Sequence, residues 1–232
     1  IENFIPEPFF EMHATVKAEK GIFKAKYNKK FSTKKELQDL IKKHELLASN
    51  PGGISDIKTK RISQPSPFLF SLSDLQSLIN KKYKVSPSDT LKHVQSLYEA
   101  KLLSYPRSDC RYITDSEFHY LIERIDGYQS VLNYTIEQPN TSKRKRYVDG
   151  SKVQEHYAII PTKKVPTQKE LDKLTSIQKE IYYTVLKRTM AMFETDYKYD
   201  ETTITVEIKK LPFISKGRTI LDKGWRKLEY AA

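Results

Sequence analysis

The residue whose setting most suggests chemistry is Tyr105, which begins the run Tyr105-Pro106-Arg107-Ser108-Asp109. The residue before a proline favours an extended backbone, and alternate side chains of an extended chain project to the same side. Arg107 is therefore predicted to lie beside the phenol of Tyr105. A phenol is a weak nucleophile at neutral pH, but a neighbouring guanidinium would favour the phenolate and could hold a phosphate through two hydrogen bonds.

This pairing suits attack of a tyrosine on a DNA phosphodiester to give a phosphotyrosine ester. Such an ester keeps the energy of the broken bond, so the strand can be resealed without ATP. The sequence contains fifteen tyrosines, so residue type alone does not single out Tyr105. For an isolated Tyr-Pro-Arg tripeptide the alternative is a surface turn, with the ring packed on the preceding helix.

Composition narrows the class of protein. Among the 232 residues, 41 Lys and Arg outnumber 29 Asp and Glu, giving a net charge of +12. This surplus favours a polyanionic partner such as nucleic acid, although a solvated Lys-rich surface would give the same balance. The single cysteine, Cys110, excludes an internal disulfide and a cysteine-based zinc site and makes the cytosol the default compartment. No apolar run is long enough to cross a bilayer.

The secondary-structure pattern is strand-rich at both ends and helix-rich between. Alternating apolar residues predict strands within residues 1–30, 54–62 and 202–208. Helices are predicted to begin at the capping residues Ser32 or Thr33, Ser73, Ser86, Thr114 and Thr167, with a longer helix from Ser176 to Phe193. Residues 126–155 are predicted to form a loop, which includes the basic run 143–146. That run is interpreted either as a phosphate contact or as a solvated loop.

The simplest architecture for this order is an α+β fold, in which a helical domain is inserted into a discontinuous β-rich domain. The Pro-rich stretch near residue 65 marks the point of insertion, since insertions enter at exposed loops. We predict a β-rich domain of residues 1–66 and 195–232, and a helical domain of residues 67–194 that carries Tyr105. The first residues lack Met and a signal pattern, so the sequence is interpreted as a piece of a longer chain.

Several runs together resemble the active-site region of type IA DNA topoisomerases. In chain order they are Pro67–Gln76, Thr90–Glu99, Tyr105–Asp109 and Glu155–Thr162. The last run is similar to the family's His-containing motif, and its Ala-Ile-Ile-Pro-Thr sequence is similar to that of the topoisomerase III branch. The stretches Leu174–Phe193 and Gly217–Tyr230 also fit the family's continuation, so the resemblance covers most of the chain.

The resemblance implies roles for individual residues. Tyr105 matches the nucleophile, Arg107 the cation beside it, and His156 a histidine near the scissile phosphate. Asp109 falls where the family has an acidic residue that would orient this histidine. Positions implied to contact the DNA strand are Gln76, Gln95, Ser108 and Arg111. A lone histidine, outside such a pattern, would be better explained as a core residue bonded to backbone.

Some positions depart from the family pattern. Ser108 stands where Thr is common and Cys110 where Ser is common, and both substitutions keep a small side chain. Tyr157 stands where His or Glu is often seen, which leaves its role open. The family also needs a Toprim domain, in which an Asp-x-Asp-x-Glu run binds Mg²⁺. No Asp-x-Asp occurs in this sequence.

The resemblance therefore implies the family's domains II and III: a β-rich arch and hinge, and a mainly helical, winged-helix-like catalytic domain. Mg²⁺ would be bound in the full-length enzyme and not by this fragment, which alone should not relax DNA. The implied partners are single-stranded DNA and the Toprim and remaining toroid domains of the same chain, with no membrane. The implied location is the bacterial cytoplasm, in association with the nucleoid.

Two other functions stay open on the sequence. A compact, basic helical domain could be a DNA-binding module without catalysis, but such a module needs neither the Tyr105 run nor the His156 motif. A plasmid relaxase also uses a tyrosine, but it should show closely spaced metal-binding histidines. The histidines of this sequence are scattered at positions 13, 44, 93, 119 and 156.

Overall fold

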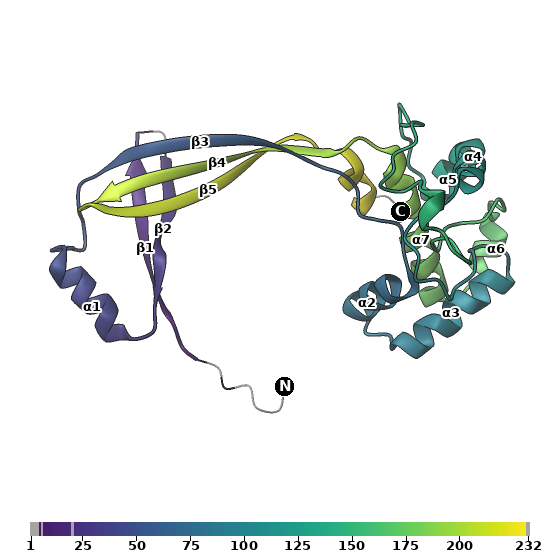
Figure 1. Ribbon diagram of the computed structural model, residues 1–232, viewed down its shortest axis with the longest axis horizontal. Coiled ribbons are helices and arrows are strands. Elements are labelled where there is room, and N and C mark those ends of the chain that lie inside the picture. Colours follow the sequence, from purple (N-terminus) through teal and green to yellow (C-terminus); the bar gives the residue numbers. More distant parts are fainter. Residues whose placement is uncertain (1–4, 6, 20, 231–232) are drawn as a thin grey trace. The chain divides into compact units, whose positions relative to one another are not determined.

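The computed structural model describes residues 5, 7–19 and 21–230. The chain forms two compact units (Figure 1): a strand unit, which runs up to Ile62 and includes Lys198–Leu221, and a helical unit of Ser63–Tyr197 with residues from Asp222 onward. The α+β fold predicted from the sequence is confirmed. The predicted domain limits, 1–66 with 195–232 and 67–194, differ from these units mainly at the C-terminal end. Residues after Asp222 lie with the helices because Trp225 and Leu228 are buried there.

The strand unit is a five-stranded sheet in the order β1-β2-β5-β4-β3. The strands are β1 Phe10–Ala18, β2 Gly21–Phe31, β3 Gly52–Gln64, β4 Tyr197–Ile208 and β5 Leu211–Asp222. β1 pairs antiparallel with β2, and β2 with β5. Lys209 and Lys210 both adopt positive φ, 51° and 65°, which is the backbone that a two-residue turn between β4 and β5 requires.

The core of the strand unit is small. Ala25, Leu211 and Phe213 are buried, and half-buried residues such as Val16 and Leu40 pack around them. Leu40 comes from α1, Lys34–Lys43, which begins at Thr33, whose side chain accepts the N–H of Glu36. The cap at this helix therefore follows the sequence prediction.

The helical unit contains six α-helices among the described residues. They are α2 Leu72–Tyr83, α3 Pro87–Glu99, α4 Asp115–Glu123, α5 Ile125–Leu132, α6 Gln168–Asp172 and α7 Ser176–Met190, followed by the 3₁₀ turns η2 Ala191–Phe193 and η3 Gly224–Tyr230. The predicted caps at Ser86, Thr114 and Thr167 are confirmed. No helix of the described residues is both long and apolar enough to cross a membrane.

Two helix predictions are wrong in detail. α2 is capped by Ser71 and not by Ser73, because the Ser71 side chain accepts the N–H of Asp74 and so starts the helix two residues earlier. The predicted loop of residues 126–155 contains all of α5 except its first residue, Ile125. Its Gly127 is required by packing, because a Cβ there would lie 2.8 Å from the Val165 side chain.

Candidate active site

The loop that carries Tyr105 is fixed by backbone pairing to the loop that carries His156. The Ser104 N–H donates to the Ile160 carbonyl at 2.9 Å, and the Thr162 N–H donates to the Leu102 carbonyl at 3.1 Å. The Ser104 hydroxyl adds two further bonds, donating to the Ala158 carbonyl and accepting from the Ile160 N–H, each at 3.0 Å. These bonds hold Tyr105 at a defined distance from the His156 loop.

The same two loops are tied to the start of α2. The Ile159 N–H donates to the Phe70 carbonyl at 2.8 Å, and the Leu72 N–H donates to the Ser108 carbonyl at 2.8 Å. Arg188 of α7 supports this segment, because its guanidinium donates to the Phe68 carbonyl at 2.8 Å. Burial lowers the pKa of Arg188 to about 10. The site is thus built on packed backbone and not on a free loop.

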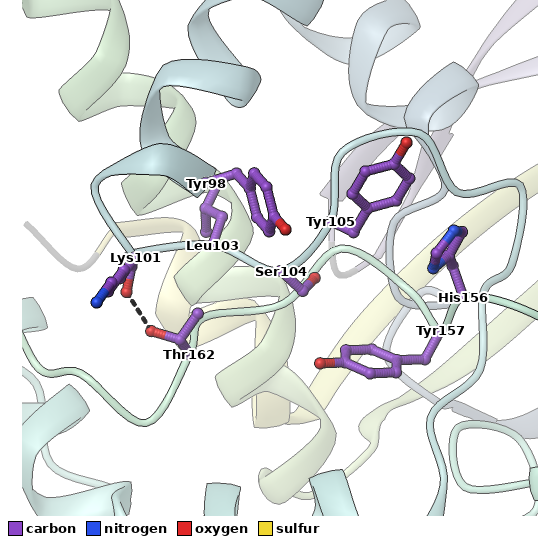
Figure 2. A pocket seen from close by; sticks show the side chains of 8 residues that line it. All are labelled: Tyr98, Lys101, Leu103, Ser104, Tyr105, His156, Tyr157 and Thr162. Atoms are coloured by element: carbon purple, nitrogen blue, oxygen red, sulfur yellow. Dashed lines mark hydrogen bonds between the residues drawn. The ribbon is translucent and has the colours of Figure 1, made fainter.

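Tyr105 and His156 lie in direct ring contact. Their ring centroids are 4.2 Å apart, and the Tyr98 ring meets Tyr105 edge to face at 5.6 Å. Tyr105 is half-buried and His156 is exposed. Both rings line a hollow of about 360 Å³, which we call the aromatic hollow. Figure 2 shows its lining residues, which are Tyr98, Lys101, Leu103, Ser104, Tyr105, His156, Tyr157 and Thr162.

The structure does not bring Asp109 into the aromatic hollow. Asp109 is exposed and lines a second hollow of about 290 Å³, which we call the cationic hollow; its lining residues are Phe68, Ser71, Ser73, Asp109, Cys110, Arg111, Tyr112 and Lys152. Within the described part of the chain, Asp109 makes no hydrogen bond or ion pair with His156. The residue before it, Ser108, does reach the His156 segment, because its buried hydroxyl donates to the His156 carbonyl at 3.3 Å.

Arg107 is exposed, and among the residues described it forms no ion pair or hydrogen bond. Its guanidinium is therefore available to a ligand. Arg111, in contrast, is bound in a two-point ion pair with Asp74, at 2.5 and 2.7 Å. Burial raises the pKa of Asp74, but hydrogen bonds from Arg111 and Ser71 outweigh burial and hold that pKa below its ordinary value.

The two predicted glutamine contacts are both engaged within the chain. The Gln76 amide donates to the Pro87 carbonyl at 2.9 Å, and the Gln95 amide donates to Glu99 at 2.9 Å. Gln76 therefore links α2 to the start of α3, and Gln95 makes a surface pair along α3. Contact of either residue with DNA stays a prediction.

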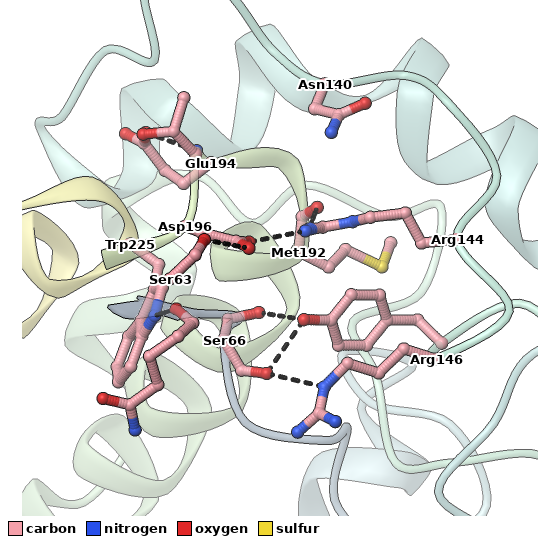
Figure 3. A network of polar contacts seen from close by, with 12 residues as sticks. Ser63, Ser66, Asn140, Arg144, Arg146, Met192, Glu194, Asp196 and Trp225 are labelled. Atoms are coloured by element: carbon pink, nitrogen blue, oxygen red, sulfur yellow. Dashed lines mark hydrogen bonds and ion pairs between the residues drawn. The ribbon is translucent and has the colours of Figure 1, made fainter. Parts of the chain in front are cut away.

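The basic run 143–146 is mostly built into the fold. Arg144 binds Asp196 and the Met192 carbonyl, and Arg146 donates to the Ser66 carbonyl at 3.1 Å. Figure 3 shows this network, in which Ser63 also bonds to Asp196 at 3.0 Å. The hydroxyl of Ser66 bonds further to Tyr147, at 2.7 Å. This cluster, which we call the clasp, holds two of the four cations of the run, Arg144 and Arg146, and Lys143 pairs separately with Asp115 at 2.8 Å.

Sequence reasoning did not single out Tyr98 and Ser104 as parts of the site, and it left Tyr157 without a role. All three line the aromatic hollow. Ser104 directly precedes Tyr105, but its function as a bridge to residues 158 and 160 depends on pairing between segments that are far apart in the sequence. Tyr98 belongs to α3 and is 39% exposed.

The described residues do not fit a Mg²⁺ site. No three His, Cys, Asp or Glu side chains gather there as a group that could hold a metal ion. Mg²⁺ prefers oxygen ligands from carboxylates, and the carboxylate of Asp74, at the start of α2, is already paired with Arg111. No step of the chemistry is therefore assigned to a metal held by these residues.

Comparison with known proteins shows the family to which this chain belongs. The sequence profile described as DNA topoisomerase matches residues 1–232. The chain belongs to this family, as a fragment of a type IA DNA topoisomerase. The fold agrees: the full-length topoisomerase I of Thermotoga maritima matches with a TM-score of 0.69 over 100% of this chain and 37% of that one, at 21% sequence identity.

Among individual relatives, the chain is similar to bacterial enzymes named DNA topoisomerase 3. It is 30% identical to that of Bacillus cereus ATCC 14579 over 236 residues, which cover 98% of this chain and 31% of the relative. It is 31% identical to the Bacillus licheniformis protein over 234 residues, covering 97% and 31%, and 28% identical to that of Bacillus subtilis 168. The chain thus spans 31% of the length of these relatives.

Proposed function

We propose that, in its full-length parent, this chain supplies the nucleophile of a type IA DNA topoisomerase, and that Tyr105 cleaves one DNA strand. The observation that carries the proposal is the contact of the Tyr105 and His156 rings at 4.2 Å, in a chain whose whole length matches the DNA topoisomerase family. Tyr105 would attack a phosphodiester of single-stranded DNA and keep the 5′ phosphate. The parent would then pass another strand, reseal the break, and so relax or decatenate DNA.

The cleavage step is a transesterification. The phenol oxygen of Tyr105 forms a bond to phosphorus, while the bond from phosphorus to the 3′ oxygen of the preceding nucleotide breaks. The phenol loses one proton and the 3′ oxygen gains one, so charge and atoms balance. Resealing is the same reaction in reverse, with the 3′ hydroxyl as nucleophile. No ATP is consumed, because the ester conserves the energy of the bond.

The neighbouring side chains have separate tasks in this proposal. Arg107, which is exposed and unpaired among the described residues, would bind the non-bridging phosphate oxygens through its two-point geometry. His156 would sit against the same phosphate as a hydrogen-bond donor. Ser108, through its bond to the His156 carbonyl, would keep the loop that carries Tyr105 in place against the loop that carries His156. Gln76, Gln95, Ser108 and Arg111 are proposed as further DNA-facing positions.

The rest of the cycle belongs to the parent chain. The strand unit would serve as arch and hinge, and Mg²⁺ would be bound by a Toprim domain outside this chain, since the described residues offer no group of ligands for it. We therefore expect no relaxation of supercoiled DNA by the chain alone. We assign the parent to the bacterial cytoplasm, at the nucleoid, with single-stranded DNA and its own toroid domains as partners.

The test is covalent capture by the full-length parent. A single-stranded oligonucleotide with a labelled 3′ side should become attached to the protein, and Tyr105→Phe should abolish the adduct. Tyr83→Phe is the matched control, because Tyr83 lines neither hollow of the helical unit. An adduct that persists in Tyr105→Phe removes Tyr105 from the role. An adduct lost equally in the control would show that the assay reports folding and not chemistry.

A further inference from the structure

The aromatic hollow beside Tyr105 has walls that suit a flat, unsaturated ring. Figure 2 shows Tyr98, Ser104, Tyr105 and Tyr157 arranged around one opening, with His156 beside Tyr105. Three of these five residues are tyrosines, and the fully buried Leu103 also lines the hollow. The hollow holds about 360 Å³, which lies within the range of about 300–1,000 Å³ typical of sites for small ligands.

The frame of the hollow is rigid because its backbone groups are already paired. Thr162 donates its hydroxyl to the Lys101 carbonyl at 2.5 Å, and Ser104 is bonded to Ala158 and Ile160 as described above. In contrast, the hydroxyls of Tyr98 and Tyr157 have no hydrogen-bond partner within the part of the chain that the structure describes. These two hydroxyls are therefore free to bond to a ligand.

The protonation of Tyr157 fits this task. Burial raises the pKa of its phenol, and the nearby Glu117 and Tyr98 raise it further. At neutral pH the hydroxyl therefore carries its proton and can donate to a ring nitrogen or carbonyl of a ligand. The phosphate of the same nucleotide is left to Arg107, the exposed cation that the proposed function assigns to it.

We propose that the aromatic hollow binds the base of the nucleotide that stays attached to Tyr105, with Tyr157 and Tyr98 as the residues that hold it. This inference rests on the proposed function, because it takes DNA as the substrate of Tyr105. This nucleotide is the one placed to enter the hollow, because its 5′ phosphate would be esterified to Tyr105, which lines the hollow. Stacking on tyrosine accepts any base, so the hollow fixes the position of the nucleotide more than its identity.

The experiment uses the full-length parent and a set of single-stranded oligonucleotides that share one cleavage site. In each member one nucleotide is replaced by an abasic sugar, either the nucleotide 3′ of the scissile phosphate or one of its neighbours on each side. The rate of adduct formation is measured for the wild type, for Tyr157→Ala and Tyr98→Ala, and for Tyr83→Ala. Tyr83 is half-buried in the same unit and lines neither hollow.

In the wild type and in Tyr83→Ala, we expect loss of the base 3′ of the cleaved bond to slow adduct formation about ten-fold. In Tyr157→Ala the intact oligonucleotide should already react slowly, and loss of that base should slow it little further. Equal sensitivity to the abasic sugar in Tyr157→Ala and in the wild type would overturn the proposal. So would a wild-type effect confined to the nucleotide on the 5′ side.

Two features of the experiment distinguish failure of the base-binding proposal from misfolding and from failure of the proposed function. Should Tyr157→Ala fold poorly, Tyr98→Ala gives the same comparison, because Tyr98 is exposed on α3 and its truncation should leave the core intact. Failure of the proposed function gives a different result. An adduct that still forms in Tyr105→Phe shows that Tyr105 is not the nucleophile, whatever the abasic oligonucleotides show. If adduct formation requires Tyr105 but its rate is the same for every abasic oligonucleotide, the base-binding proposal is wrong and the proposed function still stands.

Discussion

The two units of this chain are held together in different ways. In the helical unit the buried side chains run through several helices, and Leu75, Ile79, Val94 and Leu97 are all fully enclosed. In the strand unit the buried cluster is Ala25, Leu211 and Phe213. The exposed large apolar side chains follow the opposite distribution. Among the described residues, all but Tyr98 lie in the strand unit, at Ile5, Phe9, Ile22, Leu47, Ile54, Ile57, Ile220 and Leu221.

The difference shows where rigidity is needed. Tyr105 and His156 must keep their contact through a reaction, and both stand on backbone that is paired and backed by a deep core. The strand unit depends more on its inter-strand hydrogen bonds than on apolar burial, and backbone ladders with a thin core open locally at low free energy. We therefore expect the strand unit to exchange its amide hydrogens before the helical unit does.

The largest expected effect comes from Phe193→Ala in the helical unit. Phe193 is fully buried, and its ring stacks on Phe118 with centroids 5.9 Å apart. Truncation of a fully buried aromatic residue costs about 3–5 kcal/mol of unfolding free energy. Denaturant unfolding should show this loss in the more stable of two transitions. A loss below about 1 kcal/mol would mean that the core of the helical unit is no deeper than that of the strand unit.

A smaller effect is expected from Leu211→Ala in the strand unit. The neighbours of Leu211 are only half-buried and can close over the missing atoms, so the cost should be near the low end of the range for such changes, about 2 kcal/mol. Amide exchange should rise in β2, β4 and β5 and stay unchanged in α2, α3 and α7. Equal loosening of those helices would show that the two units unfold as one.

The smallest effect concerns the ion pair of Asp74 and Arg111. Its side chains are 33% and 48% exposed, so Asp74→Asn should cost less than about 1 kcal/mol at neutral pH. The pKa of Asp74 is lowered in the folded state, so the stabilisation is present above the carboxyl's unfolded pKa and is lost as pH falls through the folded value. Urea unfolding of wild type and variant should therefore differ at neutral pH and converge in strong acid. A difference that persists in acid would assign the effect to packing.

Local signals in the sequence predicted much of this structure, whereas contacts between distant segments could not be predicted from it. The helix starts at Ser86, Thr114 and Thr167 follow from caps whose partners lie within three residues. The start of α2 was misplaced because Ser71 and Ser73 both offer a capping hydroxyl, and only the folded backbone selects the first. α5 was missed because its Gly127 is typical of a loop, although packing against Val165 requires it.

The candidate site shows the same division. The short run from Tyr105 to Asp109 predicted which side chains could react, and the structure adds the ring of His156 at 4.2 Å. The positions of Asp109 and Arg111 depended on partners elsewhere in the chain: Arg111 pairs with Asp74, and Asp109 faces the cationic hollow. The role of Arg144 as a structural residue likewise depends on Asp196, far along the sequence.

The clasp bears on how such a chain could be assembled or re-engineered. Ser63 and Asp196 are bonded at 3.0 Å although 133 positions separate them, and Trp225 adds a bond from its indole N–H to the Gln64 carbonyl at 2.9 Å. The long segment between β3 and β4 thus starts and finishes at one spot, and those two strands are neighbours in their sheet. The segment between β3 and β4 could therefore be gained or exchanged as one unit, because it joins the sheet at the ends of two neighbouring strands. The exchange would have to keep η3, which carries Trp225.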